Sequence, residues 1–300
     1  MCKRFAVKDV GKLHHFVGIK ICHQNTAEVW IGQPTYTRNI LQKFGMEDAK
    51  PVSTPVDISS KLMIGAENSD TVDRELYQSA VGSLLYLSVA TRPDIAFAVS
   101  DVAKHCAKPT KQHWSAVKRI LRYLKGTINY GLRYKRSDVH QCIGFCDADW
   151  AGDVNDRKST SGYLFQINGN AVSWRSKKQS CVALSTAEAE YMALASAAQE
   201  AVWIRQLTTD MKNSPSGATV IFEDNQSCIS MAKNPQYHGR AKHIDIKYHF
   251  IRDLINSKVI QLEYCCTNDL VADMMTKGLG REHFEKLRSL CGMTELVHLE

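Results

Sequence analysis

Residues 142–153 carry three carboxylates directly after a predicted buried strand, and this arrangement narrows the choice of folds. The segment begins with apolar side chains, as a buried strand does, and continues with Asp147, Asp149 and Asp153. A strand end can deliver a carboxylate into a cleft. Most Asp-rich loops are only solvated turns, so the segment matters because three acidic segments follow it in predicted strands or helices: residues 185–191, 222–227 and 271–274.

The second half of the chain predicts a mixed α/β domain. Asn168-Gly169 is a strong two-residue turn signal between two short strands. Residues 181–184 could complete or extend the sheet. The other predicted elements are strands over 142–147, 162–167, 171–174, 219–222 and 259–264, helices over 186–211, 226–233 and 242–256, and a helical segment from about 270 to 276.

The first half predicts a hairpin followed mainly by helices. Residues 5–34 fit strands joined by a hairpin, and residues 51–75 fit an exposed connection rich in Pro and Ser. Residues 135–141 fit a linker, so we expect one domain over 1–138 and a second over 139–300. The predicted helices cover 36–44, about 76–91, 93–107 and 112–126.

The positive charge of the chain is concentrated in its first half. Residues 1–138 carry 21 Lys and Arg against 12 Asp and Glu, whereas residues 139–300 carry 17 against 19. Ten Lys and Arg fall between Lys104 and Arg136 without an acidic residue. This density favours contact with a phosphate backbone over a merely solvated helix face. The residues expected to make that contact are Lys118, Arg122 and Lys125 on one helix face, with Lys177 and Lys178 after the hairpin, where a plain exposed turn is nearly as good an explanation.

The start of the predicted long helix contains two glutamates with different expected roles. Ser185-x-x-Glu188 is a capping box, in which Ser185 caps the helix and Glu188 reaches back to the backbone. Glu188 therefore has a sufficient structural role. Glu190 has none, and its position on the helix directs it towards the core or a cleft, where a carboxylate needs a cation.

Four separate elements each supply one carboxylate. Asp147 and Asp224 end predicted strands, whereas Asp273 lies in a first helical turn, where it could serve only the helix dipole. Asp149 is a supporting residue or a turn residue, and Asp153 and Asp156 fit a loop. One carboxylate from each of four elements is what two divalent ions about 4 Å apart require for in-line phosphodiester hydrolysis. Oxygen ligands favour Mg²⁺, and Mn²⁺ is the alternative ion.

Other classes of site and location fit the sequence poorly. No apolar run is long enough for a membrane span, and the N-terminus lacks the apolar segment of a signal peptide. The ten cysteines are expected to be reduced thiols without a zinc site. His243, Asp245 and His249 do not converge at helical spacing, so a solvated or substrate-facing helix explains them better than a metal.

Two series of motifs resemble the Pol polyproteins of copia-type retrotransposons. Residues 142–280 resemble their ribonuclease H domain through CDADWAGD, DRKSTSGY, VSWRSKKQ, STAEAEYMAL, EDNQS, KHIDIKYHFIRDLI and VADMMTKGL. Residues 1–135 resemble the C-terminal part of the preceding reverse transcriptase through HHFVGIKI, QKFGMEDAKPVSTP, YQSAVGSLLYLSVATRPDIAFAVS and HWSAVKRILRYLKGT. The resemblance implies a ribonuclease H-like mixed sheet flanked by helices, of the α/β (α+β) class, preceded by a mostly helical thumb or connection remnant.

The resemblance also implies a site, a substrate and partners. Its catalytic quartet falls on Asp147, Glu190, Asp224 and Asp273, all four of which would hold magnesium. The substrate would be the RNA strand of an RNA–DNA hybrid, and the rest of a Pol polyprotein would be a partner. The paired aspartates of the polymerase motif are missing, so no DNA synthesis is expected. Many ribonucleases H also carry a histidine before the last aspartate, and residues 265–268 contain none.

Two alternatives remain open at this stage. The chain could be a non-catalytic nucleic-acid-binding remnant, which would bind duplex in a salt-dependent way without cleaving it. It could also be an interaction module that binds no nucleic acid. We expect a cytoplasmic protein, with virus-like particles and the nucleus as the other locations considered.

Overall fold

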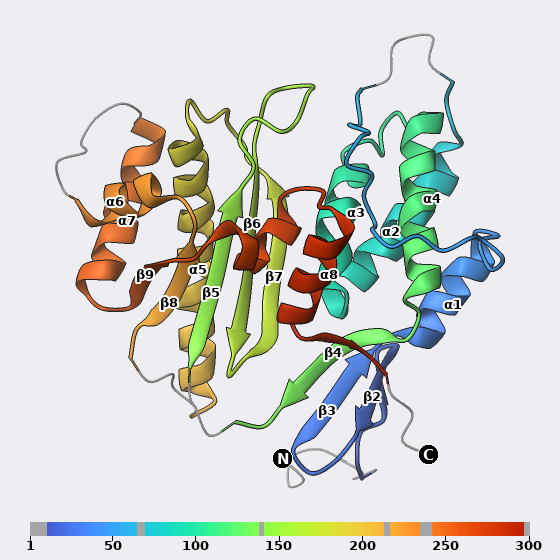
Figure 1. The fold of residues 1–300 in the computed structure, drawn as a ribbon, viewed down its shortest axis with the longest axis horizontal. Coiled ribbons are helices and arrows are strands. Elements are labelled where there is room, and N and C mark those ends of the chain that lie inside the picture. The colour runs from blue at the N-terminus through green and yellow to red at the C-terminus, as the bar shows by residue number, and fades with distance from the viewer. Residues whose placement is uncertain (1–10, 65–69, 138–140, 213–216, 235–241, 297–300) are drawn as a thin grey trace, which may run out of the picture.

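The computed structural model describes residues 11–64, 70–137, 141–212, 217–234 and 242–296, of which 242–245 are described by their backbone alone. These residues form two five-stranded sheets with helices packed beside them (Figure 1). No helix in these ranges has the length and apolar character needed to cross a membrane.

The second sheet mixes antiparallel and parallel pairs. Its order is β7-β6-β5-β8-β9, with β5–β6 and β6–β7 antiparallel and β5–β8 and β8–β9 parallel. Asn168 and Gly169 have φ angles of 55° and 74°, so the predicted two-residue turn is confirmed. The strands are β5 (Cys142–Ala148), β6 (Thr160–Ile167), β7 (Asn170–Lys178), β8 (Thr219–Glu223) and β9 (Ile260–Tyr264).

Helices cover both faces of this sheet. On one face the predicted long helix is confirmed as α5 (Thr186–Asp210), which lies with α6 (Gln226–Lys233) and α7 (Lys242–Asn256) over a core that includes Cys146 and Ile221. On the other face lie the short helix η3 (Val271–Met275) and α8 (Arg281–Leu290), so the helical segment predicted from about 270 is confirmed as a 3₁₀ turn.

The strand considered for residues 181–184 does not form. Its backbone groups have other partners, because the carbonyl of Ala183 accepts a hydrogen bond from the Trp150 indole and the amide of Leu184 binds Glu188. Cys181 and Ala183 pack in a small cluster with Ala189, whereas Val182 and Leu184 are exposed. The partners of this segment therefore come from the start of α5 and from Trp150, and not from the sheet.

The α-helices that the structure describes in the first half agree with prediction in number and order. Residues predicted as one helix over 93–107 divide into a 3₁₀ turn and a shorter α-helix. At this junction the buried Arg92 guanidinium binds Asp94, which also accepts the Tyr123 hydroxyl. The elements are α1 (Pro34–Lys43), α2 (Arg74–Ala90), η1 (Pro93–Ile95), α3 (Ala96–Ala103) and α4 (Lys111–Gly126).

The first sheet contains two strands that were not predicted. Its order is β1-β2-β3-β4-β10, and β10 comes from the far end of the described chain to pair with β4. Pairing between distant segments leaves no local pattern, which is why both strands were missed. The strands are β1 (His15–Phe16), β2 (Ile19–His23), β3 (Glu28–Gly32), β4 (Tyr130–Lys135) and β10 (Met293–Glu295).

The C-terminal segment returns to the first half. Phe284, Leu287 and Met293 are buried in the same core as the side chains of α2 and α4. Elsewhere Lys104 Nζ lies 3.4 Å from Asp153, and the Trp174 indole donates to the carbonyl of Ser88 at 2.7 Å. The expected domain boundary between residues 138 and 139 stays a prediction. The C-terminal segment lies after this boundary in the chain but packs with the residues before it.

Candidate metal centre

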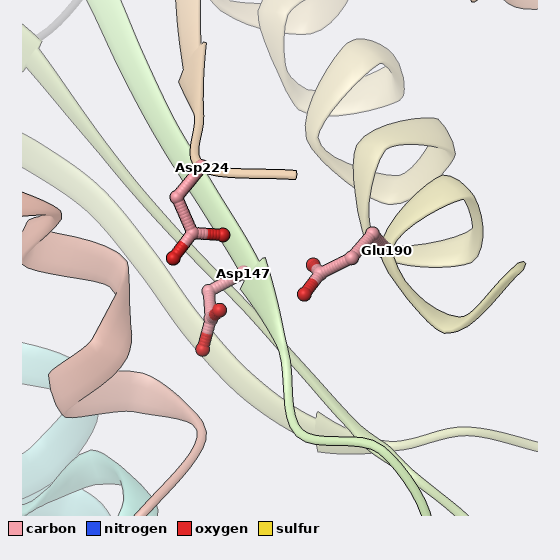
Figure 2. A group of neighbouring side chains, drawn as sticks. All are labelled: Asp147, Glu190 and Asp224. Atoms are coloured by element: carbon pink, nitrogen blue, oxygen red, sulfur yellow. The ribbon is translucent and has the colours of Figure 1, made fainter. Parts of the chain in front are cut away.

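The ends of two neighbouring parallel strands bring Asp147 and Asp224 together. Phe145 of β5 lies opposite Phe222 of β8 in the parallel register. Two residues further along each strand, the chain reaches Asp147 and Asp224. Because parallel strands end at a common edge of the sheet, the two carboxylates lie side by side there (Figure 2).

The first turns of α5 present Glu190 to the same edge. Ser185 is the N-cap, and its hydroxyl accepts a hydrogen bond from the Glu188 amide at 3.2 Å. Glu188 Oε2 accepts from the Leu184 amide at 2.8 Å, one residue before the predicted partner. Glu188 therefore serves the helix start, whereas Glu190 points towards the two aspartates (Figure 2).

Asp147, Glu190 and Asp224 form one compact group. Each offers a carboxylate oxygen, and these oxygens all lie within 4.8 Å of one another. Asp147 and Glu190 are buried, and Asp224 is half-buried. Three oxygen ligands that converge in this way are compatible with a bound divalent cation.

Burial and mutual repulsion raise the pKa values in this group. Burial, with the charges of Glu223 and the two aspartates, raises the pKa of Glu190 to about 11. Burial also raises the pKa of Asp147, although Lys277 acts against it. Glu190 Oε2 is buried and has no hydrogen-bond partner among the described residues. A bound cation would stabilise such carboxylates, so these residues fit a divalent ion.

The 3₁₀ helix η3 carries Asp273, which shares the ammonium of Lys277 with Asp147. Asp273 is fully buried, and its Oδ1 lies 2.9 Å from Lys277 Nζ. The same Nζ lies 3.6 Å from Asp147 Oδ2, which also accepts the hydroxyl of Thr276. Burial, reinforced by the charge of Asp147, raises the pKa of Asp273 to about 7. Asp273 is thus connected to the compact group through a lysine.

Gly162 allows η3 to approach the sheet closely. It lies opposite Asp147 in the β5–β6 register. A Cβ atom at Gly162 would lie 2.5 Å from Met275 Cβ and 2.7 Å from Thr276 Cγ2. Any side chain at this position would push η3 outwards, and with it Thr276 and Lys277.

Two residues of the site, Lys277 and Glu223, were not predicted from the sequence. Lys277 follows Asp273 by four residues, and a carboxylate four residues before a lysine is the spacing of a helical ion pair, so this signal was available. Glu223 ends β8 in full burial and accepts a hydrogen bond from the Cys146 thiol at 3.1 Å. Burial raises the pKa of Glu223 to about 8. Glu223 was overlooked because it directly precedes Asp224, which had already been chosen as the carboxylate of this strand end.

The loop without a histidine contributes a hydroxyl to the centre. This loop contains the 3₁₀ turn η2 (Thr267–Asp269). Thr267 Oγ1 donates to Asp224 Oδ2 at 2.6 Å, which orients that carboxylate. Lys286 of α8 holds the loop from the other side through Asp269, at 2.7 Å.

The other acidic residues of the first acidic segment have structural partners. Asp149 accepts the amide of Thr160, which agrees with a turn residue, and burial raises its pKa to about 6. Asp153 and Asp156 lie in a loop, as predicted, and bind Lys178 Nζ at 2.6 and 2.8 Å. Lys178 is therefore paired within the chain.

Lys177 lies at a groove between β7 and α5. The groove has a volume of about 210 Å³ and is also lined by Arg175 and Lys247, with Ser196 and Gln199 from α5. None of its lining residues is acidic. This face could accept a phosphate group.

The basic residues of α4 differ in their surroundings. Lys118 is exposed, whereas Arg122 and Lys125 are half-buried. Arg122 Nε donates to the carbonyl of Lys50 at 2.7 Å, so it fastens the connection before α2. Contact of these three residues with nucleic acid stays a prediction.

Of the three α7 residues considered for a metal, only His249 has a described side chain. The side chains of His243 and Asp245 lie outside the described residues. His249 is exposed on α7. The expectation that these three residues hold no metal therefore stays a prediction.

Pol polyproteins of plant transposons match almost the whole chain. The chain is 42% identical over 299 residues to the retrovirus-related Pol polyprotein from transposon TNT 1-94 of Nicotiana tabacum, an alignment that covers 98% of this chain and 22% of that protein. The chain thus spans about a fifth of that relative's length. No family model matches the chain.

Solved structures with similar folds have low sequence identity. The N-terminal RNase H domain of a Mycobacterium tuberculosis protein is 10% identical, with a TM-score of 0.35 over 50% of this chain and 97% of that one. A foamy viral protease-reverse transcriptase in complex with double-stranded DNA is also 10% identical, with a TM-score of 0.47 over 84% of this chain and 37% of that one.

The mixed sheet with its flanking helices and acidic edge has a ribonuclease H-like fold, joined here to a part that resembles a reverse transcriptase. The chain belongs to the retrovirus-related Pol polyproteins of copia-type transposons. This agrees with the resemblance that its motifs carry.

Proposed function

We propose that this chain hydrolyses the RNA strand of RNA–DNA hybrids with the help of Mg²⁺, for which Mn²⁺ can substitute. The observation that carries the proposal is the compact group of Asp147, Glu190 and Asp224, which three separate elements deliver to one sheet edge. Asp273 completes the proposed quartet from η3. Two bound ions would activate a water molecule and stabilise the leaving oxygen.

The chain's own residues prepare the site for this reaction. Asp147 would hold an ion together with Glu190 and Asp224, and Lys277 connects Asp147 to Asp273. Thr267 fixes the orientation of Asp224, and Thr276 does the same for Asp147. These hydroxyls hold the carboxylates in place before the ions and the substrate arrive.

The substrate would be held by basic residues outside the centre. Lys177 is the strongest candidate because it is exposed at a groove without acidic residues. Lys118 and Lys125 are candidates on α4. Arg122 and Lys178 are weaker ones, because each already has a partner within the chain.

The rest of a Pol polyprotein is the proposed protein partner. The relative that matches this chain is several times longer, and the present chain matches about a fifth of it. We do not expect DNA synthesis from the present chain, since it lacks the paired aspartates of a polymerase motif. The proposed location is the cytoplasm.

Cleavage of a labelled RNA–DNA hybrid tests the proposal. We expect cleavage by the full chain with Mg²⁺, none with EDTA, and none by Asp224→Asn. The matched control is Asp70→Asn, which removes an exposed carboxylate that pairs with Lys111. Cleavage that survives Asp224→Asn, or that Asp70→Asn also abolishes, would contradict the proposed site.

A second candidate is binding of duplex without cleavage. The groove with Arg175, Lys177 and Lys247 favours it, because it offers cations independently of the carboxylates. Binding that weakens steeply with salt, with no cleavage at any Mg²⁺ or Mn²⁺ concentration, would select this function.

A further inference from the structure

Lys277 occupies a position between two buried carboxylates of the centre. Its Nζ lies 2.9 Å from Asp273 Oδ1 and 3.6 Å from Asp147 Oδ2. The side chains of both aspartates are almost fully buried, at 0% and 2% exposure. Burial disfavours the charged ammonium, but the charges of Asp147 and Asp273 outweigh it and raise the pKa of Lys277.

The centre therefore has two cation positions that share one carboxylate. The first lies among Asp147, Glu190 and Asp224, and the second lies between Asp147 and Asp273. Two-metal sites hold their ions about 3.5–4 Å apart. In the structure the ammonium of Lys277 stands in the second position.

The surroundings allow Lys277 to leave this position. Its side chain is 37% exposed, far more than either aspartate. It also lines a cavity of about 270 Å³ whose wall includes Asp101, Asp149 and Asp153. A withdrawn ammonium would thus still face carboxylates.

We propose that Lys277 is a built-in cation that holds the second position of the centre, so that a second divalent ion binds there only when Lys277 withdraws. This inference rests on the proposed metal centre and adds a control over how many ions it holds. The lysine offsets the repulsion between Asp147 and Asp273, which allows both to be buried. It also makes the second ion bind more weakly than the first.

Titration of the full chain with Mn²⁺ after EDTA treatment tests this inference by calorimetry. For wild type we expect two unequal binding steps. Lys277→Met should tighten the second step by about tenfold or more, within the usual range of coupling between sites. The same variant should have a lower melting temperature in EDTA and a larger gain from Mn²⁺, because the repulsion is no longer offset.

Two lysine variants show whether the charge is responsible. Lys277→Arg keeps the charge and should keep the weak second step. Lys111→Met is the matched control, because it removes a lysine from an exposed ion pair with Asp70, outside the centre. It should leave both steps unchanged.

A second substitution locates the effect. Asp273→Asn in the Lys277→Met background should remove the tightened step, since the second position then lacks a ligand. If Lys277→Met does not fold in EDTA, Lys277→Gln replaces it with a polar, uncharged side chain.

Three results would overturn the inference: identical Mn²⁺ titrations for wild type and Lys277→Met, a Lys277→Arg variant that binds like Lys277→Met, or a tightened step that survives Asp273→Asn. The readout is ion binding, so failure of the wild type to cleave a hybrid would refute the proposed function and leave this result standing.

Discussion

Glu188 and Glu190 show how two residues of one type, two positions apart, acquire different chemistry. Glu188 binds the backbone amide of Leu184 and completes the start of α5. Glu190 faces Asp147 and Asp224, and burial raises its pKa to about 11. At neutral pH and without a cation it is therefore protonated. The difference follows from the N-cap, because Ser185 sets which side of the helix each glutamate occupies.

We expect Glu190→Gln and Glu188→Gln to separate stability from ion binding. In EDTA, Glu190→Gln should scarcely change the free energy of unfolding, because it replaces a neutral acid by a neutral amide. It should lose the stabilisation by Mg²⁺. Glu188→Gln should lower the free energy of unfolding by about 0.5–2 kcal/mol and keep the response to Mg²⁺. Urea unfolding with and without Mg²⁺ measures both, and the reverse pattern would show that the two roles are exchanged.

The junction between α3 and α4 depends on a pair of stacked histidines. The rings of His105 and His113 lie 3.8 Å apart and nearly parallel. His113 Nδ1 accepts from the amide of Thr110, so its Nε2 donates to the carbonyl of Met63. Burial, reinforced by the charge of protonated His113, lowers the pKa of His105 to about 4. Both rings are thus neutral in the folded chain at neutral pH.

This junction predicts loss of stability in mild acid. His105 has a folded pKa of about 4, below its ordinary value of 6.5, so the unfolded chain binds the proton more readily. The contribution of neutral His105 to the free energy of unfolding is complete above pH 6.5 and is lost as the pH falls from about 6.5 towards 4. His105→Gln should flatten the fall in unfolding free energy over this window, whereas His15→Gln, an exposed histidine of β1, should not. Equal slopes in the two variants would contradict the role of His105.

At the scale of the whole molecule, the C-terminal segment joins the two halves. α8 packs into the core of the first half, where Phe284 contacts Tyr123 edge to face with ring centres 5.7 Å apart. β10 then completes the first sheet. Asp273 of η3 lies just before this segment in the chain. The stability of the first half is therefore tied to residues beyond the centre.

Leu287→Ala should destabilise the first half although it lies in the second. Leu287 is fully buried, so we expect a loss of about 2–5 kcal/mol in the free energy of unfolding. Hydrogen exchange should show reduced protection in α4. Leu290→Ala on the same helix, where the leucine is largely exposed, is the control. Unchanged protection of α4 in Leu287→Ala would mean that the halves unfold independently.

Local chemistry made much of this arrangement predictable. The Asn168-Gly169 turn, the Ser185 cap and the strand ends at Asp147 and Asp224 each depend on neighbouring residues, so their sequence patterns predicted them. The cap in turn predicted the direction of Glu190. These features place three carboxylates, because strand direction and helix phase are set within a few residues.

Only the tertiary structure decided the contacts between distant segments. The pairing of β4 with β10, the partners of Lys178 and the carbonyl that holds Arg122 join residues far apart in the chain, and no local pattern encodes them. The same holds for Lys277, whose spacing pairs it with Asp273 but whose contact with Asp147 requires η3 to pack against Gly162. Tertiary packing, and not the spacing of residues along the chain, therefore placed Lys277 between Asp147 and Asp273.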